Sequence, residues 1–273
     1  MDGAVVDRIA DRIARALQAG EAVPSSALRL LVRRFVATGR DEWRPGLQCG
    51  LSAATWPDGP GHAAPGWLHA LADALVVADD DGLREAVRAQ AHACRAAWPA
   101  RGALRDAAWS VDACLAAAAA LSDGLLLADA VDELERIVGL AYEPGEGVAQ
   151  SLRTAIREPG DLATHVAAAL ALLRAFDVSG RLAYPMLAEE LMQAWLPVDT
   201  GEAVPALEAA RVLFQLAHLQ EEADYRDAAV TRAGAGYDRH GERILHAVSS
   251  APEAPLGLAA AYGLAMEEWL RRT

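Results

Sequence analysis

Apolar residues recur along the chain in two kinds of helical stretch that alternate with each other. In the first kind, such as DLATHVAAALALLRAF at 161–176 and AVPALEAARVLFQLAHL at 203–219, apolar side chains cover most of the helix surface. Such helices are buried on nearly all sides. In the second kind, such as GLREAVRAQAHACRAAW at 82–98, one face is charged and the other is apolar, which predicts a helix at the protein surface. The alternation predicts hairpins that each pair an inner helix with an outer one.

The turns between the two helices of a hairpin also repeat. FVATGR at 35–40 and FDVSGR at 176–181 both begin with Phe and end with Gly-Arg. Glycines mark four of the turns, at Gly39, Gly82, Gly124 and Gly180. Glycine suits the left-handed residue that ends a helix, and Asp or Ser caps the helix that follows. Repetition on this scale is typical of an array of helical hairpins.

The pattern predicts the position of each helix. Inner helices are expected at 25–38, 65–78, 103–121, 159–177, 202–219 and 254–270. Outer helices are expected at 45–56, 82–98, 124–140, 181–195 and 223–236. The last inner helix then lacks an outer partner, and an amphipathic helix at about 4–18 lacks an inner one. Pairing these two helices closes a ring of six hairpins, so we expect an all-α (α/α)6 toroid that forms one domain over 1–273.

Composition agrees with a helical protein and excludes some partners. Hydrophobic residues make up 53% of the chain and aromatic ones 5%, and most of the apolar residues are the helix formers Ala and Leu. The net charge of −13 argues against binding to nucleic acid or to an anionic membrane, both of which require clustered positive charge. All 25 basic residues are Arg, so a Schiff-base lysine is excluded.

The cysteines and the N-terminus indicate a cytoplasmic protein. Cys49, Cys94 and Cys114 form no C-x-x-C pair, which favours reduced thiols over a disulfide framework. The first residues include acids and no apolar signal core. The longest apolar run, ACLAAAAAL at 113–121, is too short to cross a bilayer. We therefore expect neither a nucleic-acid nor a membrane partner.

The hairpin pattern resembles the (α/α)6 toroid of the six-hairpin glycosidase-like superfamily. Residues 104–173 are most similar to the helical barrel of bacterial thioredoxin-domain-containing proteins. They present an acid-Ala-aromatic helix start (RDAAW), an outer helix, a Gly-bearing loop, an Arg-containing stretch and an inner helix. The chain carries no thioredoxin domain, and it has PGDLATH at 159–165 where those proteins have a Pro-Ser-Gly-Asn type segment. The resemblance therefore implies the fold and no particular reaction.

The functional face is predicted from the loops. In such a toroid the longer loops lead into the inner helices, and they gather beside helix N-termini, which attract polar and anionic groups. The opposite end is expected to carry only tight turns. Near the start of the third inner helix, Asp106, Trp109 and Asp112 follow at i, i+3 and i+6 and share one broad face. The two acids are candidate catalytic residues, and Trp109 is a candidate stacking platform for a sugar ring.

The same residue types also have purely structural explanations. An Asp near a helix start also caps the helix or interacts with its dipole. Trp56, Trp98 and Trp195 recur at equivalent corners after outer helices, which indicates packing residues more than a binding platform.

The interval between Gly124 and Gly180 contains an extra loop. We predict that 141–158 folds over the mouth as an irregular or two-stranded flap. Three of its residues are candidate substrate-binding groups: Tyr142, Arg153 and Arg157.

Two functions remain open at this point. The first is a carbohydrate-binding protein or a degenerate carbohydrate-active enzyme, whose site for a small carbohydrate-like ligand lies at the loop-lined mouth. The second is a non-catalytic helical-repeat scaffold for a protein partner. A closed ring with a Trp-lined cavity favours the first, and an open superhelix with an apolar groove favours the second. The His and Cys residues have no metal-site spacing, so we expect no metal and no cofactor.

Overall fold

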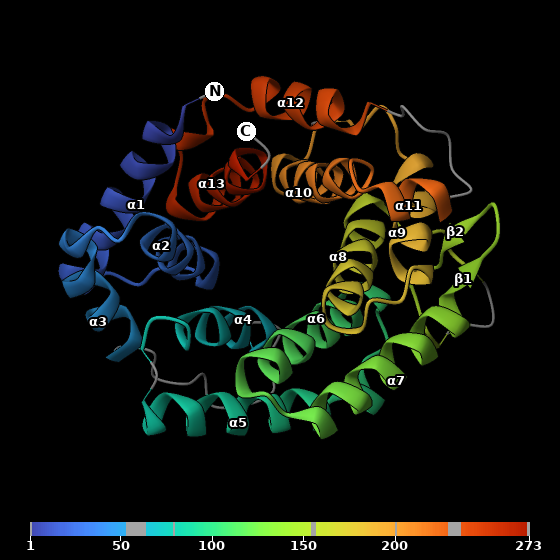
Figure 1. The fold of residues 1–273 in the computed structure, drawn as a ribbon, viewed down its shortest axis with the longest axis horizontal. Coiled ribbons are helices and arrows are strands. Elements are labelled where there is room, and N and C mark those ends of the chain that lie inside the picture. Colours follow the sequence, from blue (N-terminus) through green and yellow to red (C-terminus); the bar gives the residue numbers. More distant parts are fainter. Residues whose placement is uncertain are drawn as a thin grey trace.

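Within the described residues, six inner helices stand around a central axis and form a closed ring (Figure 1). The computed structural model describes residues 2–52, 64–78, 80–153, 157–199, 201–228 and 236–271. The inner helices are α2 (Ser25–Thr38), α4 (Ala64–Ala74), α6 (Leu104–Leu121), α8 (Leu162–Ser179), α10 (Ala203–Leu219) and α13 (Leu256–Leu270). Each packs against the next, and α13 packs against α2. The all-α toroid predicted from the sequence is confirmed.

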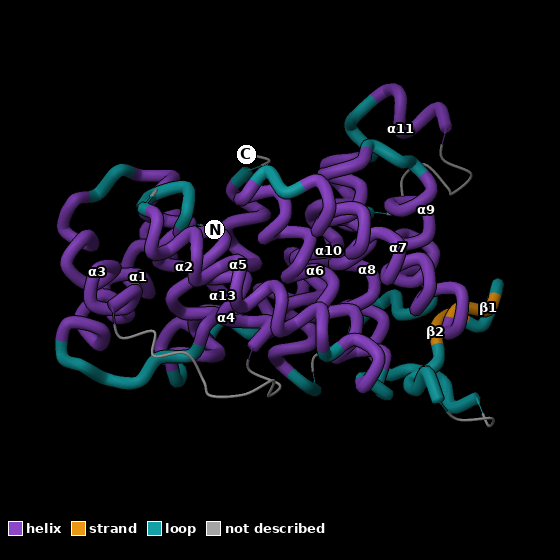
Figure 2. Tube along the Cα trace, turned by 90° about the horizontal axis from the view of Figure 1, so that it is seen from below, coloured by secondary structure: helices purple, strands orange, loops and turns teal. Residues whose placement is uncertain are grey.

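An outer layer of helices surrounds this ring (Figure 1). It consists of α1 (Gly3–Gln18), α3 (Arg44–Ser52), α5 (Asp81–Ala96), α7 (Gly124–Ala141), α9 (Ala183–Gln193) and α12 (Tyr237–Ala247). Short pieces complete it: α11 (Ala223–Ala228) and the 3₁₀ turns η1 (Asp41–Trp43), η2 (Trp98–Ala100) and η3 (Ala251–Glu253). The side view in Figure 2 shows the helices running roughly between the two ends of the ring.

The two chain ends meet, as predicted. Helix α1 packs against α13 and α2. Arg34 of α2 ties the three helices together, because it binds Asp7 of α1 at 2.6 Å and Glu267 of α13 at 3.1 Å. Arg12 of α1 also donates to the carbonyl of Ala254 at 2.9 Å, just before α13. The ring is therefore closed by buried ion pairs as well as by apolar packing.

One predicted outer helix lies elsewhere. We expected it at 223–236 and no helix between 236 and 254. Within the first range the short α11 forms at the start, and 229–235 lie outside the described residues. The outer position is taken by α12, which packs against α10. Its buried residues Tyr237, Gly241, Ile244 and Leu245 have helical spacing, a pattern hidden by the charged residues between them. A side chain at Gly241 would overlap the ring of Phe214, so glycine allows this close approach.

The caps have the predicted chemistry, but the left-handed conformation is found at two of the four turn glycines. Gly39 and Gly180 end α2 and α8 with left-handed φ angles of 67° and 68°. Gly82 and Gly124 instead lie in the first turns of α5 and α7, and the left-handed residue that ends α6 is Ser122, with a φ angle of 55°. The side chains of Asp80 and Asp161 accept hydrogen bonds of 2.8 Å from Leu83 N and Thr164 N in the first turns of α5 and α8.

Helix α8 is long and apolar enough to cross a membrane by length and composition alone. In the structure 61% of that stretch is buried inside the protein, because α8 is an inner helix of the ring.

The extra loop forms a two-stranded hairpin, but it does not cover the mouth. Strands β1 (Tyr142–Glu143) and β2 (Gly147–Val148) pair antiparallel, as predicted. The hairpin lies at the outer edge of the ring, beside α9 (Figures 1 and 2). The Tyr142 hydroxyl bonds Glu190 of α9 at 2.8 Å and holds the hairpin there. The prediction of a flap over the mouth was therefore wrong for the hairpin. The residues after it, 149–152, pair with 102–104 and 158–159 at the N-terminal ends of α6 and α8 but line neither cavity.

Candidate functional site

Two cavities formed by the described residues lie along the ring axis. The loop-end cavity, of about 510 Å³, is lined by residues from the N-terminal parts of α2, α4 and α6, together with α10 and α13. The turn-end cavity, of about 630 Å³, lies among the C-terminal halves of α2, α8, α10 and α13. Arg29 and Arg211 line both cavities, so these two side chains form the partition between them.

The partition contains buried arginines with acidic neighbours. Arg29 and Arg211 are 5% and 2% exposed. Arg29 binds Asp73 at 2.8 Å, and Arg211 forms an ion pair with Glu208 one turn before it on α10. Burial alone would raise the pKa of Asp73, but Arg29 and Arg33 outweigh burial and lower it. The carboxylate is therefore ionised and compensates the buried positive charge.

A buried histidine and aspartate connect the two cavities. His69 lines the loop-end cavity, and its Nε2 lies 2.7 Å from an oxygen of Asp112, which lines the turn-end cavity. The other oxygen of Asp112 accepts from Arg174 at 3.4 Å. Although burial opposes ionisation, His69 and Arg174 hold the pKa of Asp112 well below its usual range. Burial and the nearby Arg29 lower the pKa of His69.

These pKa shifts determine the protonation of the pair. A neutral His69 beside an ionised Asp112 donates its Nε2 hydrogen to the carboxylate, which leaves Nδ1 as a hydrogen-bond acceptor. Nδ1 is buried and has no hydrogen-bond partner among the described residues. The loop-end cavity therefore has an oriented imidazole in its floor.

Asp106 and Trp109 lie where the sequence analysis expected them, and Asp112 does not. Asp106 and Trp109 line the loop-end cavity with Arg105, which is 3.9 Å from Asp106. Trp109 is partly buried against the core. Asp112 is 3% exposed and lies one turn deeper, where it reaches the loop-end cavity only through His69.

The three hairpin candidates have structural partners. Tyr142 bonds Glu190, and burial together with Glu190 raises its pKa to about 12. Arg153 donates to the carbonyl of Pro99 at 2.7 Å, and Arg157 donates to the carbonyl of Gly147 at 2.8 Å. None of these three side chains lines either cavity. They shape the hairpin and its attachment to the ring.

The corner tryptophans pack as structural residues. Trp98 is 7% exposed, and its indole nitrogen donates to Ser110 at 3.2 Å. Trp195 meets His165 edge to face, with ring centroids 5.4 Å apart. Trp56 lies outside the described residues.

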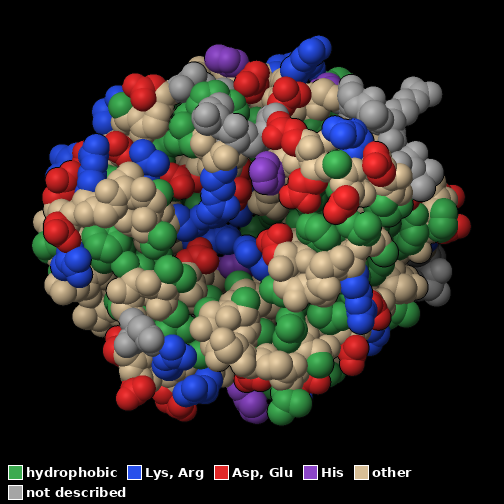
Figure 3. Space-filling model, viewed as in Figure 1, with side chains coloured by type: hydrophobic (Ala, Val, Ile, Leu, Met, Phe, Trp, Pro, Cys, Tyr) green, Lys and Arg blue, Asp and Glu red, His purple; other side chains and the backbone are tan. Residues whose placement is uncertain are grey.

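The turn-end cavity contains a network of ion pairs. Figure 3 looks into this end and shows basic side chains gathered in the central hollow with acidic ones around them. Glu268 binds Arg33 at 2.9 Å and Arg271 at 3.2 Å. Burial opposes ionisation of Glu268, but these arginines outweigh it and lower its pKa to about 2. We had expected only tight turns here, so the larger cavity at this end is a finding of the structure.

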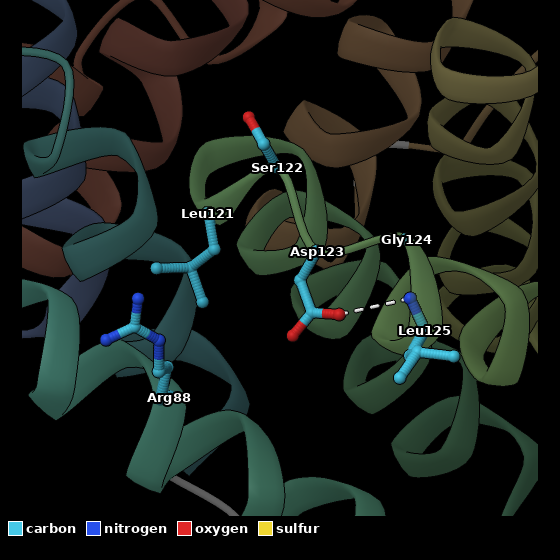
Figure 4. Close-up of a pocket in the computed structure, with 6 residues that line it drawn as sticks. All are labelled: Arg88, Leu121, Ser122, Asp123, Gly124 and Leu125. Carbon is cyan, nitrogen blue, oxygen red and sulfur yellow. Dashed lines mark hydrogen bonds between the residues drawn. The ribbon is translucent and has the colours of Figure 1, made fainter.

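A third, open hollow lies outside the ring, at the turn between α6 and α7 (Figure 4). It is lined by Arg88, Leu121 and the turn residues that follow. Asp123 caps α7 by accepting from Leu125 N at 3.1 Å, the bond drawn in Figure 4. The carboxylate in this hollow thus stabilises the turn between α6 and α7. Among the residues that the structure describes, no group of three His, Cys, Asp or Glu could hold a metal ion.

Sequence reasoning missed His69, Arg29 and Arg211. A signal was present, because each is a polar residue within an inner helix whose surface is otherwise largely apolar. Polar groups are buried in such a position only with a partner or a function. Which helices face each other across the axis, however, was visible only in the structure.

The fold is shared with solved α-1,6-mannanases. The GH76A α-1,6-mannanase from Salegentibacter sp. HEL1_6 superposes with a TM-score of 0.71 at 10% identity, covering 99% of each chain. An inactive variant of that enzyme with two neighbouring aspartates replaced, in complex with α-1,6-mannotetrose, matches with a TM-score of 0.68 at 11% identity over 98% of each chain. A second inactive variant, in complex with α-1,6-mannotriose, matches with a TM-score of 0.70 at 11% identity over 97% of this chain and 98% of the other.

At this level of identity the likeness shows the fold alone. No family model matches the sequence, and no curated protein matches it. The (α/α)6 toroid fold is confirmed, whereas membership of the six-hairpin glycosidase-like superfamily and the specific relationship to thioredoxin-domain-containing proteins stay predictions.

Proposed function

We propose that this protein binds a carbohydrate-like ligand in the loop-end cavity. The observation that carries the proposal is Trp109, a partly buried indole that lines a cavity whose floor consists of His69 and two arginines. A flat aromatic face beside hydrogen-bonding groups is suited to a sugar ring. Support also comes from the mannanase that shares the fold, two inactive variants of which are solved with mannose oligosaccharides.

The closed ring favours this proposal over the protein-binding scaffold. A scaffold of helical hairpins presents an open superhelix with a concave groove to its partner. Here α13 packs against α2, and the axis is occupied by charged side chains. The alternative of a protein–protein scaffold therefore has no groove of that kind in the described residues.

Binding is the simplest activity that the geometry supports. A glycosidase needs two carboxyl groups that reach the scissile bond. Asp112 does not fit this role, because it is buried and bonded to His69 and Arg174. The carboxylates that line the loop-end cavity are Asp106, which pairs with Arg105, and Glu208, which pairs with Arg211. The side chain of Asp106 is 26% exposed and that of Glu208 is 12% exposed, so Asp106 is the more accessible of the two. Asp106 remains the candidate for a direct contact with the ligand.

The test is a titration of the full chain with neutral and acidic mono- and oligosaccharides, read as the shift of the melting temperature. A ligand at 100 times its Kd stabilises the folded state by about 2.7 kcal/mol. Trp109→Ala and Asp106→Ala should remove this shift. Trp269→Ala is the matched control, because this partly buried indole bonds Glu242 of α12 at 3.1 Å and does not line the loop-end cavity. An equal ligand response in all variants would refute the proposal.

A further inference from the structure

The loop-end cavity is more positive than the protein as a whole. The chain has a net charge of −13. The lining nevertheless includes Arg29, Arg105 and Arg211 against the two acids Asp106 and Glu208. Among the side chains that line the cavity, three arginines thus face two acids, while Asp73, which does not line it, pairs with Arg29 from behind.

Two buried nitrogens of the floor lack a partner among the described residues. They are Nε of Arg211, a donor, and Nδ1 of His69, an acceptor. Their residues are 2% and 1% exposed. A buried polar atom left without a hydrogen bond is costly, so a ligand group that satisfies it gains affinity. Both residues line the loop-end cavity, and Arg211 lines the turn-end cavity as well. The two unpaired nitrogens, a charged donor and a neutral acceptor, lie just beneath the cavity surface.

We propose that the ligand of the loop-end cavity is an anionic saccharide, with its carboxylate, sulfate or phosphate group at Arg211 and Arg29 and a hydroxyl group at Nδ1 of His69. The inference rests on the proposed function and adds the charge of the ligand. Guanidinium groups bind oxyanions through short, charge-assisted hydrogen bonds. Asp112 fixes the tautomer of His69, so Nδ1 accepts a hydrogen from a hydroxyl group and selects against a second anionic group there.

Different side chains of the cavity are expected to recognise different groups of the ligand. Trp109 contacts the sugar ring by stacking, which is insensitive to charge. Arg105, whose side chain is 53% exposed, lies nearer to solvent than Arg211 and attracts the anion during approach. The buried arginines make the close contacts, where salt screens the interaction less.

The experiment is isothermal titration of the full chain with matched probes. Glucuronate, glucose 6-sulfate and glucose 6-phosphate are compared with glucose, and inorganic sulfate and phosphate serve as anions without a sugar. At least one anionic sugar should bind about tenfold more tightly than both glucose and the inorganic anions, because it engages both parts of the cavity. Its affinity should fall as NaCl increases.

Three other results would reject the inference, and they differ in what they imply for the proposed function. Equal affinity for glucose and the anionic sugars would overturn it and leave the proposed function intact. Binding of inorganic anions alone, or of no probe, would overturn both. Equal affinity for an anionic sugar and the matching inorganic anion would mean that the sugar ring is not recognised.

Variants locate the anion. Arg211→Lys keeps a charge but removes the guanidinium group, and Arg105→Ala removes a charge at an exposed position that does not threaten folding. Both should weaken binding of the anionic sugar about tenfold and change glucose binding less than twofold. Arg88→Ala is the matched control, because its side chain is also 53% exposed and lies on the outer helix α5. If Arg105→Ala behaves like Arg88→Ala and Arg211→Lys binds like the unmodified protein, the inference is wrong.

Discussion

The two cavities share Arg29 and Arg211, yet their polar groups are satisfied in different ways. At the turn end, Glu268 and Glu267 of α13 bind Arg33 and Arg34 of α2, so the charges compensate each other inside the protein. At the loop end, the floor contains nitrogens without partners among the described residues, and an indole lies above it. Buried ion pairs thus join α2 and α13 at the turn end, while Nδ1 of His69 at the loop end and Nε of Arg211 in the partition stay unpaired among the described residues.

The largest effect is expected at Asp112, which belongs to both regions. Asp112→Ala leaves Arg174 and the oriented His69 without their shared carboxylate. Removing one partner of a buried ion pair costs about 3–5 kcal/mol, measured here as the free energy of unfolding in urea. Asp177→Ala is the control, because Asp177 also pairs with Arg174 but its side chain is 59% exposed. That change should cost less than about 1 kcal/mol. Equal losses for the two variants would contradict the assignment of Asp112 to a buried network.

A slightly smaller effect is expected at the seam between α2 and α13. Glu268→Gln leaves Arg33, whose side chain is 11% exposed, without its carboxylate. We expect a loss of about 2–4 kcal/mol in the free energy of unfolding. Glu42→Gln is the control, because its pair with Arg40 is long, at 3.5 Å, and its side chain is 63% exposed. If the two variants have the same urea midpoint, the ring is closed by apolar packing alone.

The same network predicts how stability depends on pH. The pKa of Glu268 is lowered to about 2 from 4.5, so its contribution is complete above about pH 5 and is lost as the pH falls toward 2. The lowered pKa of His69 acts in the same direction, since below its ordinary value of 6.5 the unfolded chain takes up a proton first. Urea unfolding should therefore show falling stability from pH 7 to pH 3. The difference between the unmodified chain and Glu268→Gln should shrink below pH 4.5, and a constant difference would contradict the ion pair.

The smallest effect is expected at the hairpin. Tyr142→Phe removes the bond to Glu190, which should cost about 0.5–1.5 kcal/mol in the free energy of unfolding. Ligand binding should not change, because the hairpin lies at the outer edge of the ring. A loss of ligand binding in this variant would show that Tyr142 contributes to the binding site.

Sequence patterning predicted most helices of this fold because the spacing of apolar residues within a helix indicates which of its faces are buried. The order of the inner helices, the glycine turns and the pairing of α1 with α13 all follow from local signals. Helix α12 was missed because its apolar face is short and includes Gly241, and the exposed Arg239 and Arg243 on its other side made the segment resemble a polar loop. The position of the hairpin was missed because it depends on Glu190, a residue of another hairpin.

The candidate site was only partly predictable for the same reason. Trp109 and Asp106 follow from the face of one helix, whereas the partnership of Asp112 with His69 joins residues 43 positions apart on neighbouring helices. Which residues meet at the axis depends on the rotation of each inner helix in the ring. That rotation is set by Ala-rich contacts along the whole helix length, and no short motif records it.

The most direct test compares one variant from each cavity in a single ligand titration, using the saccharide that most strongly raises the melting temperature of the unmodified chain. Trp109→Ala should keep most of the melting temperature without ligand and lose the ligand-induced rise. Glu268→Gln should lose melting temperature without ligand and keep the full rise, because its cavity does not hold the saccharide. The opposite pattern, with the ligand response lost in Glu268→Gln and retained in Trp109→Ala, would place the ligand at the turn end and contradict the account.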